Sequence, residues 1–257
     1  MPEPIIRMRD VWFSFNGQPV LQEVNLNVPR GDFLVVLGPN GGGKTTLLKL
    51  MLGLLHPTRG TVAVFGEPPH RVSHRLGYVP QNVHINKDFP VSVLDVVLMG
   101  RLRSGRGWSR HTRPDRVAAQ QALEQMRLWE YRNRRIGELS GGQLQRVFIA
   151  RALVSGPEML FLDEAMASID AQGRGEFYEM LKELNRMVTI VAASHDMMIL
   201  SRQVKSVACV NRALYHHDSG EITQEMLDEA YHCPVDLVAH GIPHRVLGPH
   251  ADKKEDE

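Results

Sequence analysis

Hydrophobic residues form short runs in the first and last thirds of the chain and helical repeats in its middle. The stretches 5–15 and 20–28 are rich in Val, Ile, Leu and Phe, and Asn16-Gly17 between them is a turn signal. The run 33–37 is apolar throughout, which is typical of a strand buried on both faces of a parallel sheet. Similar runs return late in the chain, at 159–162, 188–193 and 206–210.

The middle of the chain predicts helices. After Pro114, apolar residues at 119, 122, 123, 126 and 129 have the spacing of one helix face. A second helix is expected after Gly142, and a shorter one over 47–54, ended by Gly53 and Pro57. Because strands and helices alternate, we predict an α/β fold with a parallel sheet core and an inserted α-helical subdomain.

Composition narrows the class of protein. The chain has 257 residues, 43% of them hydrophobic, which excludes disordered and collagen-like classes. Lys and Arg number 30 against 29 acidic residues, and this balance argues against bulk nucleic-acid binding. Cys209 and Cys233 have no zinc or disulfide spacing. We see no signal peptide and no apolar run of about 18 residues, so any membrane crossing is expected from other chains.

A glycine-rich loop follows the run 33–37 directly. It matches G-x-x-x-x-G-K-[ST], whose glycines let backbone N–H groups point at phosphate oxygens. Lys44 is expected to reach the β and γ phosphates, and the Thr45 hydroxyl to ligate Mg²⁺. A strand before the motif and a helix after it are the context that distinguishes it from a chance glycine-rich turn. The predicted nucleotide-binding residues are Gly38, Pro39, Asn40, Gly41, Gly42, Gly43, Lys44, Thr45 and Thr46.

Two carboxylates end the apolar run 159–162. In open parallel sheets, ligands lie at the carboxyl ends of strands, so Asp163 is placed to support Mg²⁺ beside the phosphate loop. Glu164 could orient or deprotonate a water that attacks the γ phosphate. By themselves these two residues are equally consistent with a strand followed by a polar turn.

A second glycine-rich turn opens the helix predicted after Gly142. Leu139 is followed by Ser140, Gly141, Gly142 and Gln143, which offer another set of N–H groups for an anion. As a bare pattern this is an ordinary helix N-cap. Together with the phosphate loop before it and Asp163-Glu164 after it, the turn favours a second phosphate-binding element over a simple helix cap.

These motifs, in this order, resemble the ATPase subunits of ATP-binding cassette (ABC) transporters over about residues 4–225. The resemblance implies a P-loop fold with an N-terminal antiparallel β part. It also implies two chains packed head to tail, with ATP between the phosphate loop of one and residues 139–143 of the other. An ATP-binding core over 1–89 and 158–225, a helical subdomain over 90–157 and a tail over 226–257 are expected.

The resemblance assigns further roles. Gln81 is implied to touch Mg²⁺ or water, and His195 to contact the γ phosphate and take part in catalysis. The segment Ala167-Ser168-Ile169-Asp170 is implied to cross the dimer interface. Phe15 stands where the family has an aromatic that stacks on adenine, with core packing beside Val11 and Phe13 as its alternative. Ala165 replaces a proline that is usual in the family.

Two segments suggest a cargo class. Residues 89–101 and 134–139 are similar to those of zinc, manganese and iron-chelate importers. We therefore expect an ATPase powering metal-ion import, zinc or manganese first, at the cytoplasmic face of the inner membrane. The implied partners are integral membrane permease subunits, a second copy of the chain and, indirectly, a solute-binding protein; no nucleic acid is expected. Alternatives are another cargo (an iron chelate, or lipid export) and a soluble ABC ATPase acting on nucleic-acid complexes.

Two other features favour simpler interpretations. Residues 101–116 hold six arginines and one acid, which a solvated loop near the membrane partner explains. Half of the 12 histidines lie in 216–257, but their spacing matches no zinc template. Gly241 and Pro243 also disfavour a shared helix face for His240 and His244. The last residues are expected to fray.

Overall fold

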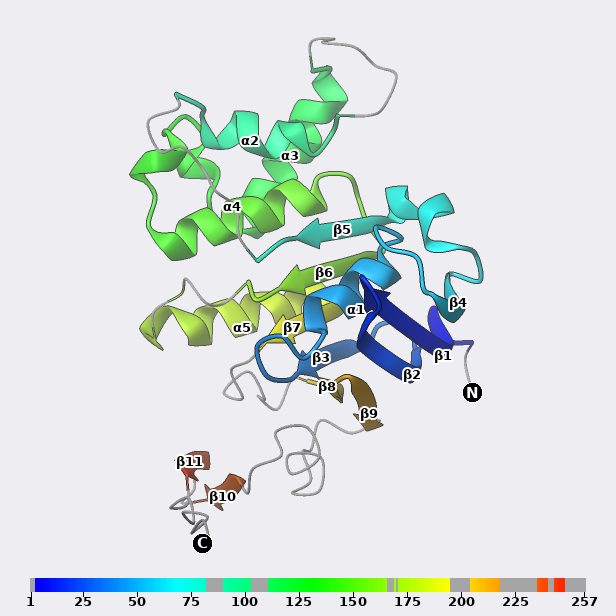
Figure 1. Cartoon of the computed structure of the whole chain (residues 1–257). Helices are drawn as coiled ribbons and strands as arrows, with labels where there is room; N and C mark the ends of the chain where they lie inside the picture. The colour runs from blue at the N-terminus through cyan, green and yellow to red at the C-terminus, as the bar shows by residue number, and fades with distance from the viewer. Residues whose placement is uncertain are drawn as a thin grey trace, which may run out of the picture.

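The computed structural model describes residues 3–81, 90–102, 111–165, 169, 171–194, 204–217, 235–239 and 243–247. Within these residues the chain forms a six-stranded sheet, a separate three-stranded antiparallel sheet, and helices that pack on both (Figure 1). Among the described residues, no helix has the length and apolar character needed to cross a bilayer.

The N-terminal strands build the antiparallel sheet, in the order β2-β1-β4. Asn16 and Gly17 join β1 to β2 with φ values of 48° and 81°, as a two-residue hairpin turn with two left-handed positions requires. The predicted strands over 5–15 and 20–28 are thereby confirmed. The bounds are Ile6–Phe15 for β1, Gln18–Val28 for β2 and Arg59–Val64 for β4.

The main sheet has the strand order β5-β6-β7-β3-β8-β9. All neighbours pair in parallel except β9, which runs antiparallel to β8. The carboxyl ends of the parallel strands therefore meet at one edge. The bounds are Phe33–Leu37 for β3, Leu76–Val79 for β5, Met159–Asp163 for β6, Thr189–Ser194 for β7, Ser206–Asn211 for β8 and Ala213–His217 for β9.

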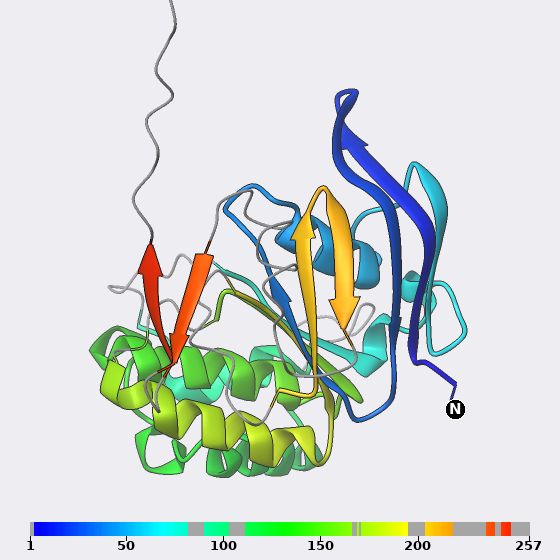
Figure 2. The same ribbon diagram turned by 90° about the horizontal axis from the view of Figure 1, so that it is seen from below.

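Apolar side chains cover both faces of the main sheet. In β3, Val35 and Leu37 pack with α2–α5, whereas Leu34 and Val36 pack with α1 and the antiparallel sheet. Figure 2 shows α1 and the blue strands on one side of the sheet and α5 with the green helices on the other. This double coverage explains why β3 is apolar at every position. The helices are α1 (Lys44–Met51), α2 (Val93–Met99), α3 (Arg113–Gln125), α4 (Gly141–Leu153) and α5 (Ala171–Asn185).

Two helix boundaries differ from the sequence prediction. The helix expected over 47–54 runs from Lys44 to Met51, because the loop residue Gly43 caps it with a left-handed conformation. Trp129 does not continue α3: Arg127 has φ 56°, which ends the helix, and Trp129 begins a separate 3₁₀ turn, Trp129–Tyr131. The other 3₁₀ turns are Pro69–Arg71, Ser73–Arg75 and Ile136–Glu138.

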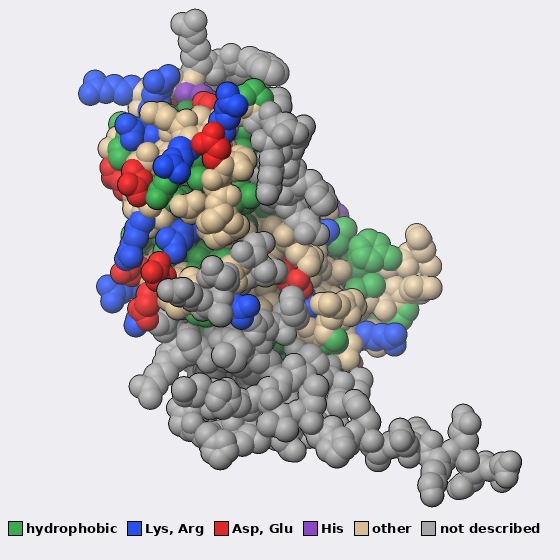
Figure 3. Space-filling model, turned by 90° about the vertical axis from the view of Figure 1, so that its left-hand side faces the viewer, with side chains coloured by type: hydrophobic (Ala, Val, Ile, Leu, Met, Phe, Trp, Pro, Cys, Tyr) green, Lys and Arg blue, Asp and Glu red, His purple; other side chains and the backbone are tan. Residues whose placement is uncertain are grey.

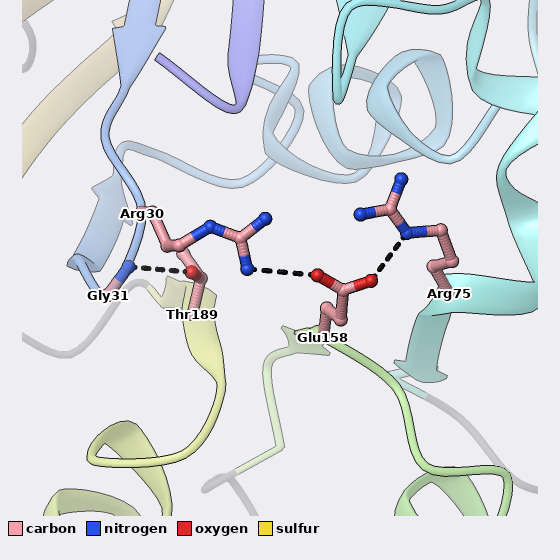
Figure 4. A network of polar contacts seen from close by, with 5 residues as sticks. All are labelled: Arg30, Gly31, Arg75, Glu158 and Thr189. Carbon is pink, nitrogen blue, oxygen red and sulfur yellow. Dashed lines mark hydrogen bonds and ion pairs between the residues drawn. The ribbon is translucent and has the colours of Figure 1, made fainter. Parts of the chain in front are cut away.

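A polar network ties the amino ends of several strands together (Figure 4). The Glu158 carboxylate, just before β6, accepts from Arg75 Nε at 2.6 Å and Arg30 Nη1 at 2.9 Å. The Gly31 amide donates to the Thr189 hydroxyl of β7 at 2.9 Å. The guanidinium of Arg75 also stacks 3.6 Å from the centre of the Phe65 ring. These contacts join the two sheets at the edge opposite the phosphate loop.

Near the C-terminus, β10 (Val235–Ala239) and β11 (Pro243–Leu247) form an antiparallel hairpin, with Val235 opposite Leu247. His244 therefore lies in a strand. His240 lies outside the described residues.

Candidate nucleotide-binding site

The phosphate loop connects the central strand β3 to α1. Gly38 is required by a close approach, since a Cβ atom there would lie 2.1 Å from the carbonyl oxygen of Val210. Gly43 is required by its conformation, because φ is 104° and a side chain would be strained. The loop thus brings its backbone against the sheet edge and leads into the amino end of α1, where helix N–H groups favour an anion.

A cavity of about 310 Å³ lies on this loop. Glu164 and Gln81 reach it from the carboxyl ends of β6 and β5, so these two residues and the phosphate loop meet at one edge of the sheet. Val20 reaches it from β2 of the antiparallel sheet. The lining residues are Val20, Asn40, Gly41, Gly43, Lys44, Thr45, Thr46, Gln81 and Glu164.

Lys44 lies at the floor of the cavity and its side chain is 5% exposed. Its Nζ donates to the carbonyl oxygens of Gly38 at 3.0 Å and Pro39 at 3.1 Å. The same nitrogen lies 3.3 Å from Oε1 of Glu164, whose side chain is also buried. One ammonium group thus touches both the phosphate loop and the proposed water-activating carboxylate.

Asp163 is held through both of its carboxylate oxygens. Oδ1 accepts from the Thr45 hydroxyl at 3.0 Å, and Oδ2 accepts from the Tyr78 hydroxyl at 3.2 Å. Burial raises the pKa of Asp163, and the two hydrogen bonds oppose that shift. The pKa of Tyr78 is raised by burial and by the neighbouring carboxylate, so the phenol remains a proton donor.

Glu164 follows Asp163 in an uncommon conformation. Its φ is 49°, and its amide donates to the carbonyl oxygen of Ala193 in β7 at 2.9 Å. A left-handed non-glycine residue is strained and is often found at functional sites. The side-chain Oε2 accepts from Gln81 Nε2 at 2.6 Å, so both of its oxygens have partners.

The donor set suits Mg²⁺. The Thr45 hydroxyl uses its single proton on Asp163, which leaves its oxygen lone pairs available to a cation. The Asp163 carboxylate is adjacent, and Gln81, whose side chain carries an amide oxygen, lines the same cavity. Hydroxyl, carboxylate and amide oxygens are the hard ligands that Mg²⁺ takes, together with phosphate oxygens.

The glycine-rich turn 139–143 lies apart from the phosphate-loop cavity, at a second cavity. The Ser140 hydroxyl accepts from the Gln143 amide at 3.3 Å, and the Gln143 side chain accepts from the Ser140 amide at 3.0 Å, a capping box that starts α4. Ser140 and Gly141 are exposed. A cavity of about 240 Å³ here is lined by Ser140, Gly141, Gly142, Gln143, Arg146, Ile169, Gly173 and Phe177. It shares no residue with the first cavity.

Other expected residues have different outcomes. Phe15 is 50% exposed and packs edge-on against Phe13, with ring centroids 4.7 Å apart. The alternative that Phe15 packs in the core is therefore wrong: Phe15 is the last residue of β1 and lies beside the exposed hairpin turn. His195, Ala167, Ser168 and Asp170 lie outside the described residues.

Sequence reasoning gave no role to Tyr78, which contacts Asp163, or to Arg146, which lines the second cavity. Tyr78 precedes Gln81 by three positions, but its contact with Asp163 spans 85 residues and depends on strand order. Arg146 lines the second cavity one helical turn after Gln143. Its i, i+3 spacing from Gln143 was the available signal.

The fold and the first cavity define a P-loop nucleoside triphosphatase. Residues 21–167 match the ABC transporter family. The zinc uptake ATP-binding protein ZnuC of Bacillus subtilis is 38% identical over 75% of this chain and 84% of its own length. ZurA of Listeria innocua, a zinc uptake system ATP-binding protein, is 37% identical over 87% of this chain and 89% of its own.

A solved ABC transporter assigned to the metal-chelate type, in an inward-facing conformation, superposes with a TM-score of 0.82. It is 28% identical, over 95% of this chain and 97% of that one. The chain therefore belongs to the ABC transporter family. It is an ATP-binding subunit of that family and an ATPase, as the resemblance implied.

Proposed function

We propose that this chain hydrolyses ATP to power the import of a metal ion, zinc or manganese, through separate membrane subunits. The ATPase part rests on the meeting of Lys44 and Thr45 with Asp163 and Glu164 at one sheet edge. The metal part rests on similarity to subunits of zinc uptake systems over most of the chain.

The phosphate loop binds the triphosphate. Backbone N–H groups of residues 40–46 and the amino end of α1 face the anion, and Lys44 contacts the β and γ phosphates. For this contact Lys44 exchanges its bonds to Gly38 and Pro39 for bonds to phosphate oxygens. Phe15, exposed at the end of β1, is free to stack on adenine.

Thr45 and Asp163 would hold Mg²⁺, with Gln81 beside them. When bound, the ion neutralises charge on the phosphate oxygens. Asp163 orients the Thr45 hydroxyl by accepting its hydrogen bond, so that the oxygen lone pairs point away from the carboxylate. Gln81 reaches the same cavity from the end of β5 and also orients Glu164.

Glu164 acts as the general base. It takes a proton from a water, the water oxygen forms a bond to the γ phosphorus, and the bond to the β–γ bridging oxygen breaks to release ADP. The contacts from Gln81 and Lys44 fix the direction of its carboxylate. We propose that His195, which follows β7 directly, contacts the γ phosphate.

Two copies of the chain complete each site. Ser140 and Gly141 are exposed at the start of α4, and their cavity is separate from the phosphate loop. In a head-to-tail dimer the turn 140–143 of one chain closes over the phosphates on the other. Ile169, the one described residue of the segment 167–170 that is implied to cross the dimer interface, is buried and lines that same cavity.

The remaining partners follow from the family. We propose that permease subunits in the membrane bind this chain at the cytoplasmic face, and that a solute-binding protein delivers the metal on the other side. Basic and acidic side chains are interspersed over the described residues of the face in Figure 3, which suits a protein partner better than nucleic acid.

A reconstituted system tests this function. The chain is co-purified from membranes, and its permease partner is identified and placed with it in vesicles. Addition of ATP is expected to move Zn²⁺ or Mn²⁺, followed by a metal-sensitive dye, and the Lys44→Ala variant is expected to move none. Co-purification with ribosomes or DNA, without a membrane protein, would overturn the transport role.

A further inference from the structure

The carboxylate of Asp163 has one hydrogen-bond donor on each oxygen. Thr45, on α1, donates to Oδ1, and Tyr78, on β5, donates to Oδ2. Asp163 itself is 1% exposed, so solvent contributes little to its hydrogen bonding. A carboxylate turns easily about its last side-chain torsion, and one donor alone would leave that rotation open. Two donors on opposite oxygens fix it.

The strand order explains how Tyr78 reaches this carboxylate. In the parallel β5–β6 pair, Tyr78 lies opposite Phe161, two residues before Asp163. The long phenol side chain covers that offset and brings its hydroxyl to the end of β6. Three residues later Gln81 donates to Glu164 at 2.6 Å. Residues at the end of β5 thus support both consecutive carboxylates of the site.

We propose that Tyr78 is a positioning residue for the metal-bound nucleotide. By holding Oδ2, it keeps Oδ1 of Asp163 on the Thr45 hydroxyl, so that the hydroxyl oxygen faces a cation without reorganisation. The hydroxyl of Tyr78 contributes one hydrogen bond as donor, and the aromatic ring contributes packing. This inference rests on the proposed role of Asp163 beside Mg²⁺.

The Tyr78→Phe variant removes the hydroxyl and keeps the ring. The affinity for a fluorescent ADP analogue is measured with Mg²⁺ and again with EDTA, and the ratio of the two gives the gain in affinity due to the metal. Outer contacts to metal ligands typically change metal affinity by 10–100-fold. Since the Tyr78 bond is 3.2 Å long, we expect the lower end, a loss of about tenfold in the metal-dependent gain. Binding in EDTA is expected to stay the same.

The Tyr215→Phe variant is the matched control. Tyr215 lies on β9, is 38% exposed and is far from Asp163. Its replacement by Phe removes the same hydroxyl group at a different place. It is expected to retain the full metal-dependent gain. Thermal melting in EDTA checks that both variants are folded.

Three outcomes would overturn the inference. A full gain in Tyr78→Phe removes the positioning role and leaves the proposed ATPase site intact. An equal loss of affinity in Mg²⁺ and in EDTA shows that the hydroxyl serves only the fold. A wild-type chain whose affinity does not depend on Mg²⁺ removes the proposed role of Asp163 as well, and so is distinguished from the first outcome.

Discussion

The Nζ of Lys44 lies 3.3 Å from Oε1 of Glu164, and both side chains are more than nine-tenths buried. A buried ammonium and a buried carboxylate compensate each other's charge, so loss of one partner leaves an uncompensated charge. In the proposed mechanism the triphosphate therefore meets a lysine that is already paired, next to the carboxylate proposed to act on water. The proposed binding and hydrolysis roles thus share this pair.

The Glu164→Gln variant separates the two roles. Its amide keeps the shape of the side chain but does not take up a proton from water. We expect hydrolysis to fall about 10²–10⁴-fold, the usual contribution of a general base. ATP binding is expected to persist and to trap a dimer, seen by light scattering. Phosphate release at the wild-type rate would remove Glu164 from this role. The control is Glu124→Gln on α3, expected to keep full turnover.

The Lys44→Ala variant is expected to lose both ATP affinity and turnover. It removes the ammonium group from the phosphate loop and leaves Glu164 with its Gln81 contact. Titration with an ATP analogue measures the affinity, and a melting curve shows whether the unpaired carboxylate also lowers stability. Lys182→Ala on α5, where an exposed lysine pairs with Glu179, should change neither quantity. Unchanged affinity in Lys44→Ala would refute its assignment.

Local patterns were sufficient to predict several elements. The five apolar residues of β3 were predicted with their bounds, because burial on both faces removes polar residues from the strand. The start of α4 could be read from Ser140 and Gln143, whose capping box is formed by neighbours in sequence. The meeting of the phosphate loop with Asp163 followed from the rule that parallel strands end at one edge.

Other features depend on contacts that no local pattern contains. The start of α1 at Lys44 is fixed by Gly43, whereas the apolar periodicity begins only at Leu47. The Tyr78–Asp163 bond exists because β5 pairs with β6 across an intervening helical segment. Phe15 contacts the buried Phe13 but is itself exposed, because it lies at the end of β1 beside the exposed hairpin turn; simple alternation does not predict this.

Phe15 is expected to contribute to nucleotide affinity. Its ring is 50% exposed and is held edge-on by Phe13, so it forms a platform before any base arrives. Stacking of a base on an aromatic ring is worth about 1–3 kcal/mol, so Phe15→Ala should weaken ATP binding about tenfold or more. Phe15→Tyr should retain the affinity. Leu54→Ala, at another exposed apolar residue, serves as the control in the same titration.

Glu158 is expected to make the free energy of unfolding depend on pH. Hydrogen bonds from Arg75 and then Arg30 lower the pKa of Glu158 from 4.5 to about 2 (Figure 4). A lowered pKa in the folded state means that the stabilisation is complete above the unfolded value near 4.5 and is lost as pH falls toward about 2.

The Glu158→Gln variant tests this. The Glu158 side chain is 39% exposed, so its ion pairs are comparable to surface pairs. We therefore expect the variant to lose about 1 kcal/mol of unfolding free energy at pH 7. The difference from wild type should shrink by pH 3 in urea titrations. A difference that stays constant between these pH values would contradict the ion-pair explanation.

Mixing two inactive variants tests the shared site. Lys44→Ala damages the phosphate loop, and Ser140→Arg places bulk and charge in the turn that is proposed to close over the partner's phosphates. Each is expected to be inactive alone. In a mixed dimer, the intact phosphate loop of one chain meets the intact turn of the other. After random mixing, half of the dimers are mixed and each has one complete site of two, so about a quarter of the sites recover.

Ser155→Arg, beyond the other end of α4, is the control and should remain active by itself. If the mixture stays inactive although the two variants still bind each other, then neither chain supplies part of its partner's site.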